Sequence, residues 1–213
     1  MTSHSLRESL PPLPFHMQHL PVDERGFPIP WFVAWIDGKP DFRVADAEKI
    51  GTAVNFGRCW ICGKPLGKYL SFVAGPMCAI NRVSSEPPSH FDCASFAVRA
   101  CPFLVHPNAV RREANRPAES VEPPGVFIQH NPTVSVVWTT LRFKLLRADG
   151  GVLFSMGDPE SVQWFTHGRN ATRAEALSAL EKGLPVLREI AEAEDAHNEL
   201  QRAIDEVLPL LPD

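Results

Sequence analysis

The chain has 213 residues, of which 44% are hydrophobic and 22% charged, and its formal net charge is −4. A chain of this length and composition can bury a sizeable core, which excludes a largely disordered protein. No apolar run reaches the ~20 residues of a membrane-spanning helix, and residues 1–15 lack the apolar stretch of a secretory signal. We therefore expect a cytoplasmic protein with reduced cysteines and no membrane contact.

Charge is distributed unevenly along the chain. Residues 1–124 contain 13 Lys/Arg and 12 Asp/Glu, whereas residues 125–213 contain 8 and 13, so the two parts carry +1 and −5. Neither part has the basic excess of a protein that grips nucleic acid non-specifically. A local basic patch around the cysteines is a candidate nucleic-acid contact, with ordinary solvated charge as the alternative; its residues are Arg58, Lys64, Lys68 and Arg82.

The first elements are an arm, a hairpin and a short helix. Residues 1–30 contain six prolines, which favour an extended arm laid on the body or a mobile tail. Two β-favouring runs follow, within 31–44, and Asp37-Gly38 between them predicts a tight turn. Residues 45–55 then predict a helix, ended by Gly57.

Five cysteines follow within 43 residues, and four side chains there have the spacing of a zinc site. In Cys59-x-x-Cys62-Gly63, two intervening residues let both sulfurs face one point, and the glycine permits the positive φ that completes the turn. His90 and Cys93 are three residues apart, which places both on one face of a helix.

The segments between and after these pairs complete the predicted unit. Residues 69–73 and 77–80 predict a β-hairpin around Ala74-Gly75-Pro76, and Ser89 is the expected N-cap of a helix that ends near residue 100.

The Cys-x-x-Cys-Gly turn (a zinc knuckle), the hairpin and the helix with the second ligand pair together resemble the treble-clef zinc finger over residues 58–100. The resemblance implies a closed structural zinc site with Cys59 and Cys62 in the knuckle and His90 and Cys93 on the helix. Cys78 or Cys101 can be considered in place of His90 as the fourth ligand, although buried packing is the preferred interpretation for both.

Treble clefs include the His-Asn-His nucleases, which carry a catalytic histidine in the hairpin and bind a second metal. The hairpin predicted here has no histidine; Cys78, Asn81 and Arg82 occupy the corresponding region. This difference argues against a nuclease of that class. The rest of the chain looks loosely like small proteins of bacteria and their phages, with no motif of known chemistry.

A proline-containing linker is expected at 105–124, followed by a second unit. Its first predicted elements are strands at 133–140, 142–147 and 152–156, which form a two- or three-stranded antiparallel meander, and a helix over 158–168. A Thr172–Glu175 capping box then opens a helix that ends at Gly183, and a last helical stretch begins at Pro185 and can be broken by the acidic segment 192–199.

We predict an α+β fold with a proline-rich arm (1–30), a zinc-binding unit (31–104), a linker (105–124) and a meander-plus-helices unit (125–213). The favoured function is a zinc-stabilised binding or adaptor protein that contacts another protein or a nucleic acid. The alternative is an enzyme: a metal-dependent hydrolase or nuclease with a second metal near His90 or His106, or a thiol enzyme using Cys78. A third possibility is that residues 125–213 act as an oligomerisation module.

Overall fold

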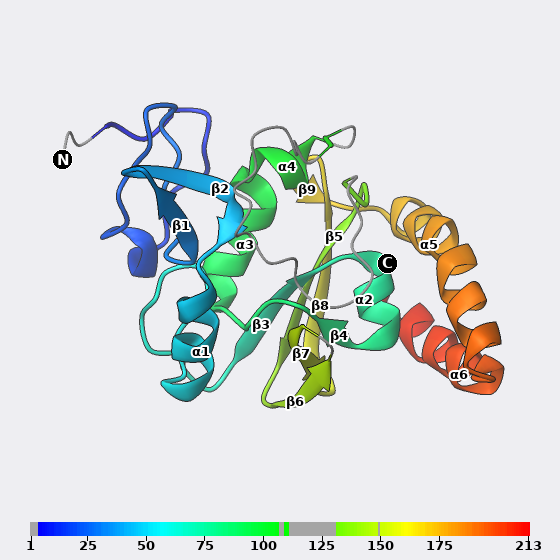
Figure 1. Ribbon diagram of the computed structural model, residues 1–213. Coiled ribbons are helices and arrows are strands. Elements are labelled where there is room, and N and C mark those ends of the chain that lie inside the picture. The colour runs from blue at the N-terminus through cyan, green and yellow to red at the C-terminus, as the bar shows by residue number, and fades with distance from the viewer. Residues whose placement is uncertain (1–3, 107–108, 111–130, 149) are drawn as a thin grey trace.

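The computed structural model describes residues 4–106, 109–110, 131–148 and 150–213 (Figure 1). Most of the predicted linker at 105–124 lies outside these residues. The strands are β1 (Val33–Ile36), β2 (Lys39–Ala45), β3 (Leu70–Ala74), β4 (Val83–Ser84), β5 (Ser135–Thr140), β6 (Phe143–Ala148), β7 (Gly151–Met156), β8 (Pro159–Thr166) and β9 (Arg169–Asn170). The helices are η1 (Phe15–Met17), α1 (Ala47–Asn55), α2 (Pro76–Asn81), α3 (Phe91–Ala100), α4 (Pro102–Val105), α5 (Arg173–Ala193), α6 (His197–Val207) and η2 (Leu208–Leu210). The predicted α+β class is confirmed.

The N-terminal hairpin and helix form as their sequences predict. Strands β1 and β2 pair antiparallel across Asp37 and Gly38, which both have positive φ, the conformation of the tight turn expected there. Helix α1 begins after Asp46, whose side chain accepts a hydrogen bond from the backbone N–H of Glu48.

Two antiparallel sheets form the centre of the molecule. One has the order β3-β5-β8-β9 and the other the order β4-β7-β6. The predicted hairpin β6–β7 is present, but β5 does not join it in a meander. Instead β5 lies between β3 and β8, so residues 70–74 and the C-terminal residues 135–166 share one sheet.

Two segments have a different type of secondary structure from the one predicted. Residues 77–80 are not the return strand of a hairpin: Pro76 opens helix α2, because proline at a first helical position already has the φ a helix requires. Residues 158–168 are not a helix but strand β8, in which Val162 and Trp164 pack into the core and the intervening Gln163 is exposed. This alternation of core-facing and exposed side chains is typical of a strand, and it outweighs the helix-start signal at Pro159.

Helix α5 continues through Gly183 and Pro185, where the sequence predicts a break. A Cβ on Gly183 would lie 2.6 Å from Cγ of Met77 on α2, so the glycine permits α5 to pack closely against that helix. Packing therefore outweighs the local preference of the Gly-x-Pro sequence. The predicted break in the acidic segment is confirmed between α5 and α6.

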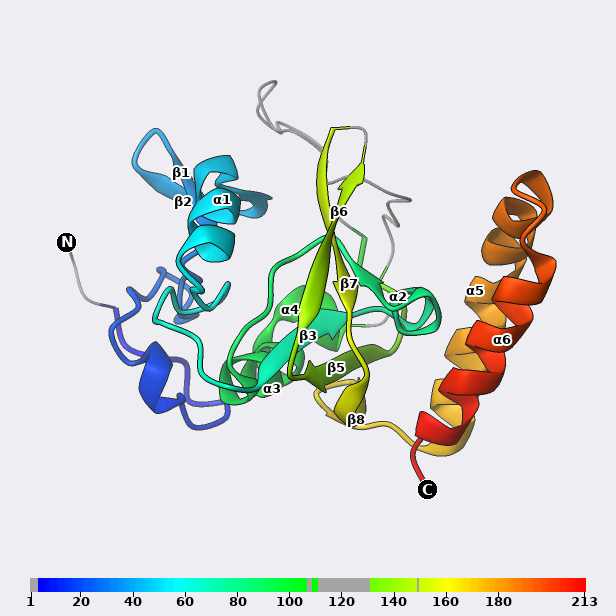
Figure 2. The ribbon, with the colours of Figure 1, turned by 90° about the horizontal axis from the view of Figure 1, so that it is seen from below.

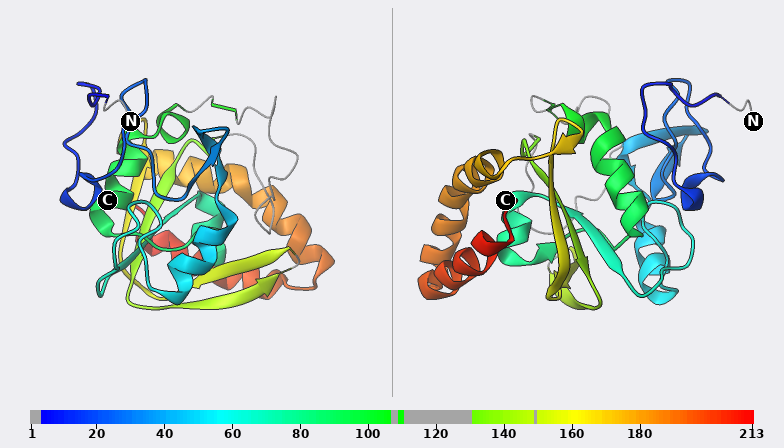
Figure 3. Two further views of the ribbon diagram at one scale, coloured as in Figure 1. Left: turned by 60° about the vertical axis from the view of Figure 1, so that its left-hand side comes forward. Right: turned by 180° about the vertical axis from the view of Figure 1, so that it is seen from behind.

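Helices cover both faces of the sheet β3-β5-β8-β9. Figure 2 shows α3 and α4 on one side and α2 between the strands and the α5–α6 pair on the other. Figure 3 shows the arm and β1–β2 on the α3 side, with α5 and α6 at the opposite end. The larger core lies on the α2 side, where Phe72, Trp138 and Phe154 are fully buried.

The segment after α6 is hydrogen-bonded to this core: the indole N–H of Trp164 donates to the carbonyl of Leu210 at 2.8 Å. Within the described residues, no helix combines the length and apolar character needed to cross a bilayer.

The predicted capping box at the start of α5 is present. The Thr172 hydroxyl accepts a hydrogen bond from the backbone N–H of Glu175, and the Glu175 carboxylate accepts one from the backbone N–H of Thr172 at 2.8 Å. Arg169 also pairs with Glu175, and its hydrogen bonds lower the pKa of that carboxyl to about 2.

Replacing the capping residue tests this local account. We expect Thr172→Ala to lower the free energy of unfolding in urea by about 1 kcal/mol, because an N–H at the start of α5 loses its acceptor. Ser178→Ala, an exposed change inside the same helix, serves as the control and should stay within ~0.5 kcal/mol. Equal stabilities for the two variants would contradict the assigned cap.

Candidate metal centre

The first ligand pair lies in a tight loop that begins right after α1. The backbone N–H of Cys62 points at the sulfur of Cys59, with a nitrogen–sulfur distance of 3.4 Å, and the N–H of Gly63 donates to the Cys59 carbonyl at 2.8 Å. An antiparallel bridge between Arg58 and Pro65 closes the base of the loop. These backbone contacts turn both thiols toward one point, as the Cys-x-x-Cys-Gly spacing predicts.

Gly63 is required in this loop for two reasons. Its φ is +72°, a conformation that residues with a Cβ rarely adopt. A Cβ there would also lie 2.6 Å from the ring of Trp31, which packs on the loop and whose backbone N–H donates to Ile61 at 2.7 Å. The residue after the second cysteine thus lets the start of the β1 region close over the loop.

The second ligand pair reaches the loop because the segment before α3 is tied to β3. Ser89 and Ser71 exchange two backbone hydrogen bonds, of 2.9 and 2.7 Å. Ser89 is therefore extended. The sequence predicts Ser89 as the N-cap, and this prediction is wrong. His90 is the N-cap residue, outside the first turn, and Cys93 lies within that turn.

Four ligand atoms come together where the two segments meet. They belong to Cys59, Cys62, His90 and Cys93, and all lie within 4.8 Å of one another. Nδ1 of His90 is 3.4 Å from the sulfur of Cys62 and 3.8 Å from that of Cys93. A zinc ion with bonds of about 2.3 Å has ligands about 3.8 Å apart in a tetrahedron, so the set can hold a metal ion such as zinc.

The imidazole of His90 is oriented for coordination through Nδ1. Its other nitrogen, Nε2, lies 2.9 Å from the carbonyl oxygen of Pro65, a hydrogen-bond acceptor. An Nε2–H donated to that carbonyl leaves the lone pair of Nδ1 directed at the sulfurs. Metal-bound histidines are commonly fixed in this way by a backbone carbonyl. Sequence reasoning does not single out Pro65, because the contribution comes from its backbone.

The three thiols are fully buried, and His90 is partly exposed. Hydrogen bonds within the cluster shift the pKa values of its members. Hydrogen bonds from Cys62 and Cys93 lower the pKa of the Cys59 thiol, and donation to Cys59 and Cys62 raises the pKa of Cys93. Hydrogen bonds to Cys59 and Cys62 raise the pKa of His90 to about 10. The cluster therefore favours a positive charge among its sulfurs.

The proline-rich arm packs over this cluster. Met17 and Leu20 are buried in one apolar cluster with Cys59, Cys62 and Cys93. The ring of His16, in η1, stacks on that of His90 with centroids 4.1 Å apart. His16 thus covers a ligand and is not itself part of the four-residue set, a role that no local sequence signal indicates.

The other candidate ligands and nucleophiles lie elsewhere. Cys78, on α2, packs against the larger core, and burial raises the pKa of its thiol, which makes it a poor nucleophile. Neither Cys78 nor Cys101 belongs to the four-residue set. Across residues 4–106, 109–110, 131–148 and 150–213, no second group of three or more possible ligands includes His106.

The predicted basic patch is divided. Arg58 and Lys64 lie in the cysteine loop, which the Arg58–Pro65 bridge closes. Lys68 follows the loop, and its ammonium lies over the exposed ring of Tyr69. Arg82 instead ends α2 and pairs with Asp158 at 2.9 Å and Glu206 at 3.0 Å. The charge of Arg82 is therefore paired with carboxylates of the same chain, on the side of the larger core.

The sequence predicts a hairpin between the two ligand pairs, in addition to the loop and the ligand-bearing helix that the structure contains. The predicted hairpin between them is absent, because β3 pairs with β5 and residues 76–81 form α2. A long-range strand partner thus replaces the local one.

Substitution of Gly63 tests the geometry of the loop. We expect Gly63→Ala to lower the free energy of unfolding by about 2 kcal/mol or more, because positive φ and the Trp31 ring both oppose a Cβ. Gly67→Ala is the matched control: Gly67 lacks a positive φ and has open space around it, so a change within ~0.5 kcal/mol is expected. If both variants unfold like the parent, the loop geometry described here is wrong.

Comparisons with known proteins give no further identification: no family model, no curated protein and no solved structure matches this chain.

Proposed function

We propose that this chain is a zinc-stabilised binding protein whose metal is structural and whose surface contacts another protein. The observation that supports this most directly is the four-residue ligand set: three buried thiols and one oriented imidazole would fill all four positions of a tetrahedral zinc site. Catalytic zinc sites usually keep one position open for water or substrate. We regard the unit as a treble-clef variant in which the central sheet takes the place of the hairpin.

The proposed role of the metal is to join three segments. The cysteine loop, the start of α3 and the arm meet at the cluster, and the arm contributes Met17 and Leu20 to the same apolar core. Zinc would supply the positive charge that the buried sulfurs favour, and the ordering of these segments would depend on it. Such a coupling suits a protein that presents a fixed surface to a partner.

Metal content is the direct test. We expect protein purified without added metal to contain about one zinc ion per chain, measured by plasma mass spectrometry. Cys93→Ser should lose that zinc and unfold or become protease-sensitive, because a structural zinc site supplies much of the folding free energy. Cys101→Ser, outside the ligand set, should keep both the zinc and the fold. A folded, metal-free parent protein would refute the proposal, and two metals per chain would favour a metal-dependent enzyme.

Zinc binding should also release protons. The raised pKa of His90, about 10, means that at pH 7 the metal-free cluster carries a proton that zinc must displace. Apparent zinc affinity should therefore increase with pH between 6 and 8. Calorimetry in buffers of different ionisation enthalpy measures the proton count, and pH-independent affinity would contradict the assigned ligands.

A nucleic-acid partner is the competing outcome. Of the four predicted contacts, Arg58, Lys64 and Lys68 lie in or next to the loop in the sequence, whereas Arg82 is paired with two carboxylates. Salt-sensitive binding of DNA or RNA at low ionic strength, lost when Lys64 and Lys68 are reversed to glutamate, would select nucleic acid over protein.

A further inference from the structure

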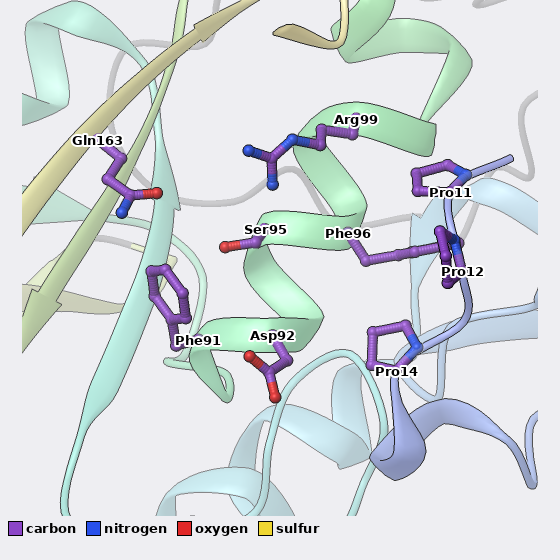
Figure 4. A pocket seen from close by; sticks show the side chains of 9 residues that line it. All are labelled: Pro11, Pro12, Pro14, Phe91, Asp92, Ser95, Phe96, Arg99 and Gln163. Carbon is purple, nitrogen blue, oxygen red and sulfur yellow. The ribbon is translucent and has the colours of Figure 1, made fainter. Parts of the chain in front are cut away.

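A groove lies between the arm, α3 and β8, along the flank of α3 (Figure 4). It encloses about 470 Å³, and three arm prolines, Pro11, Pro12 and Pro14, form one of its walls. Phe91 at the start of α3 also lines a second, smaller pocket further along β8. Phe91 is thus shared by two neighbouring pockets.

Polar groups of α3 face this groove in one stripe. Asp92, Ser95 and Arg99 are spaced three and four residues apart, which places them on one side of the helix. The stripe from Asp92 to Arg99 is about 10 Å long, the span of about three residues of an extended chain. An extended peptide therefore fits it better than a compact ion.

Ser95 gives an independent sign of a ligand. The residue is only 8% exposed, and its hydroxyl makes no hydrogen bond within the described residues. Buried hydroxyls are nearly always hydrogen-bonded, because an unmade bond costs free energy. Figure 4 shows this hydroxyl pointing into the groove, on the side to which Arg99 and Gln163 also direct their polar ends.

Arg99 supplies the positive charge beside that hydroxyl. Its guanidinium lies over the ring of Phe165, 4.6 Å from the centroid, and donates to the side chain of Asn170 at 3.3 Å. In the part of the chain that the structure describes, no carboxylate forms an ion pair with it. A guanidinium held in place beside a hydroxyl donor is suited to a carboxylate.

The backbone of strand β8, beside the groove, offers hydrogen-bonding groups to an extended peptide. On its outer side, strand β8 pairs with β9 at Phe165 and Thr166, and the Trp164 carbonyl accepts a hydrogen bond from the backbone N–H of Ala171; no strand pairs there with the residues before Trp164 in the described part of the chain. Within the described residues, the backbone around Gln163 is therefore an open edge. Extended peptides commonly bind such edges through backbone hydrogen bonds.

We propose that this groove binds an extended segment of a partner protein, with a carboxylate of that segment on Arg99 and Ser95 and an apolar side chain against Phe91. The inference rests on the proposed binding function and names the class of partner and the surface. Asp92, at the other end of the stripe, would receive a basic group or backbone N–H. The carboxylate belongs either to an acidic side chain or to a chain terminus.

The test is a selection on the full chain with a random library of eight-residue peptides displayed with free carboxyl termini. We expect enriched peptides to share an acidic residue or a terminal carboxylate beside an apolar residue. Synthetic copies with amidated termini distinguish the two sources: loss of binding on amidation identifies the terminus, and retained binding identifies a side chain.

Three variants decide whether the peptides use this groove. Arg99→Gln should weaken binding by about tenfold or more, the effect of losing a charge-assisted hydrogen bond, whereas the exposed Arg188→Gln on α5 should not change it. Ser95→Ala should weaken binding yet raise the midpoint of unfolding, because it removes a buried hydroxyl without a partner. A merely structural Ser95 would leave binding unchanged.

Zinc content, measured on each preparation, separates this inference from the proposed function. If zinc-containing protein enriches no peptide, or only peptides indifferent to Arg99 and Ser95, the groove proposal is overturned and the zinc proposal stands. If the groove binds peptide in protein that holds no metal, the zinc proposal fails alone.

Discussion

The N-terminal part of the structure depends on one constraint, the meeting of two ligand pairs that lie far apart in the sequence. The backbone bridge between Ser71 and Ser89 sets the position at which α3 begins, and the Pro65 carbonyl fixes the ring of His90. The first contact joins backbone atoms of both residues, and the second joins a backbone oxygen to the imidazole. The four ligand atoms are therefore brought together by the path of the chain as well as by any ion they hold.

The same bridge connects the candidate metal centre to the rest of the molecule. Strand β3, which carries Ser71, pairs with β5, and Phe72 on its opposite face is fully buried in the larger core. One sheet thus has the ligand-bearing helix on one face and α2 with the C-terminal helices on the other. Helix α3 packs on β5 and β8 as well as on β3, so the candidate metal centre and the larger core share the whole sheet.

The sequence predicts the features that depend on local chemistry. The Asp37-Gly38 turn, the capping box at Thr172 and the Cys-x-x-Cys-Gly loop all form, because each needs only residues a few positions apart. The failures are elements whose structure is decided at long range. Strand β3 pairs across more than 60 residues of sequence with β5, and Gly183 remains helical because Met77 lies against it. No local sequence pattern indicates either contact. None indicates that the Ser95 hydroxyl is buried without a hydrogen-bond partner among the described residues.

The long-range pairing also sets an order for folding during synthesis of the chain. Cys93 completes the ligand set before β5 has been made, so the metal-binding part can assemble while the sheet cannot. Until residues 135–140 emerge, β3 has an unpaired edge, and until Leu210 emerges the indole of Trp164 lacks its acceptor. The larger core thus joins segments that are far apart in the order of synthesis, and its contacts form later than those of the ligand set.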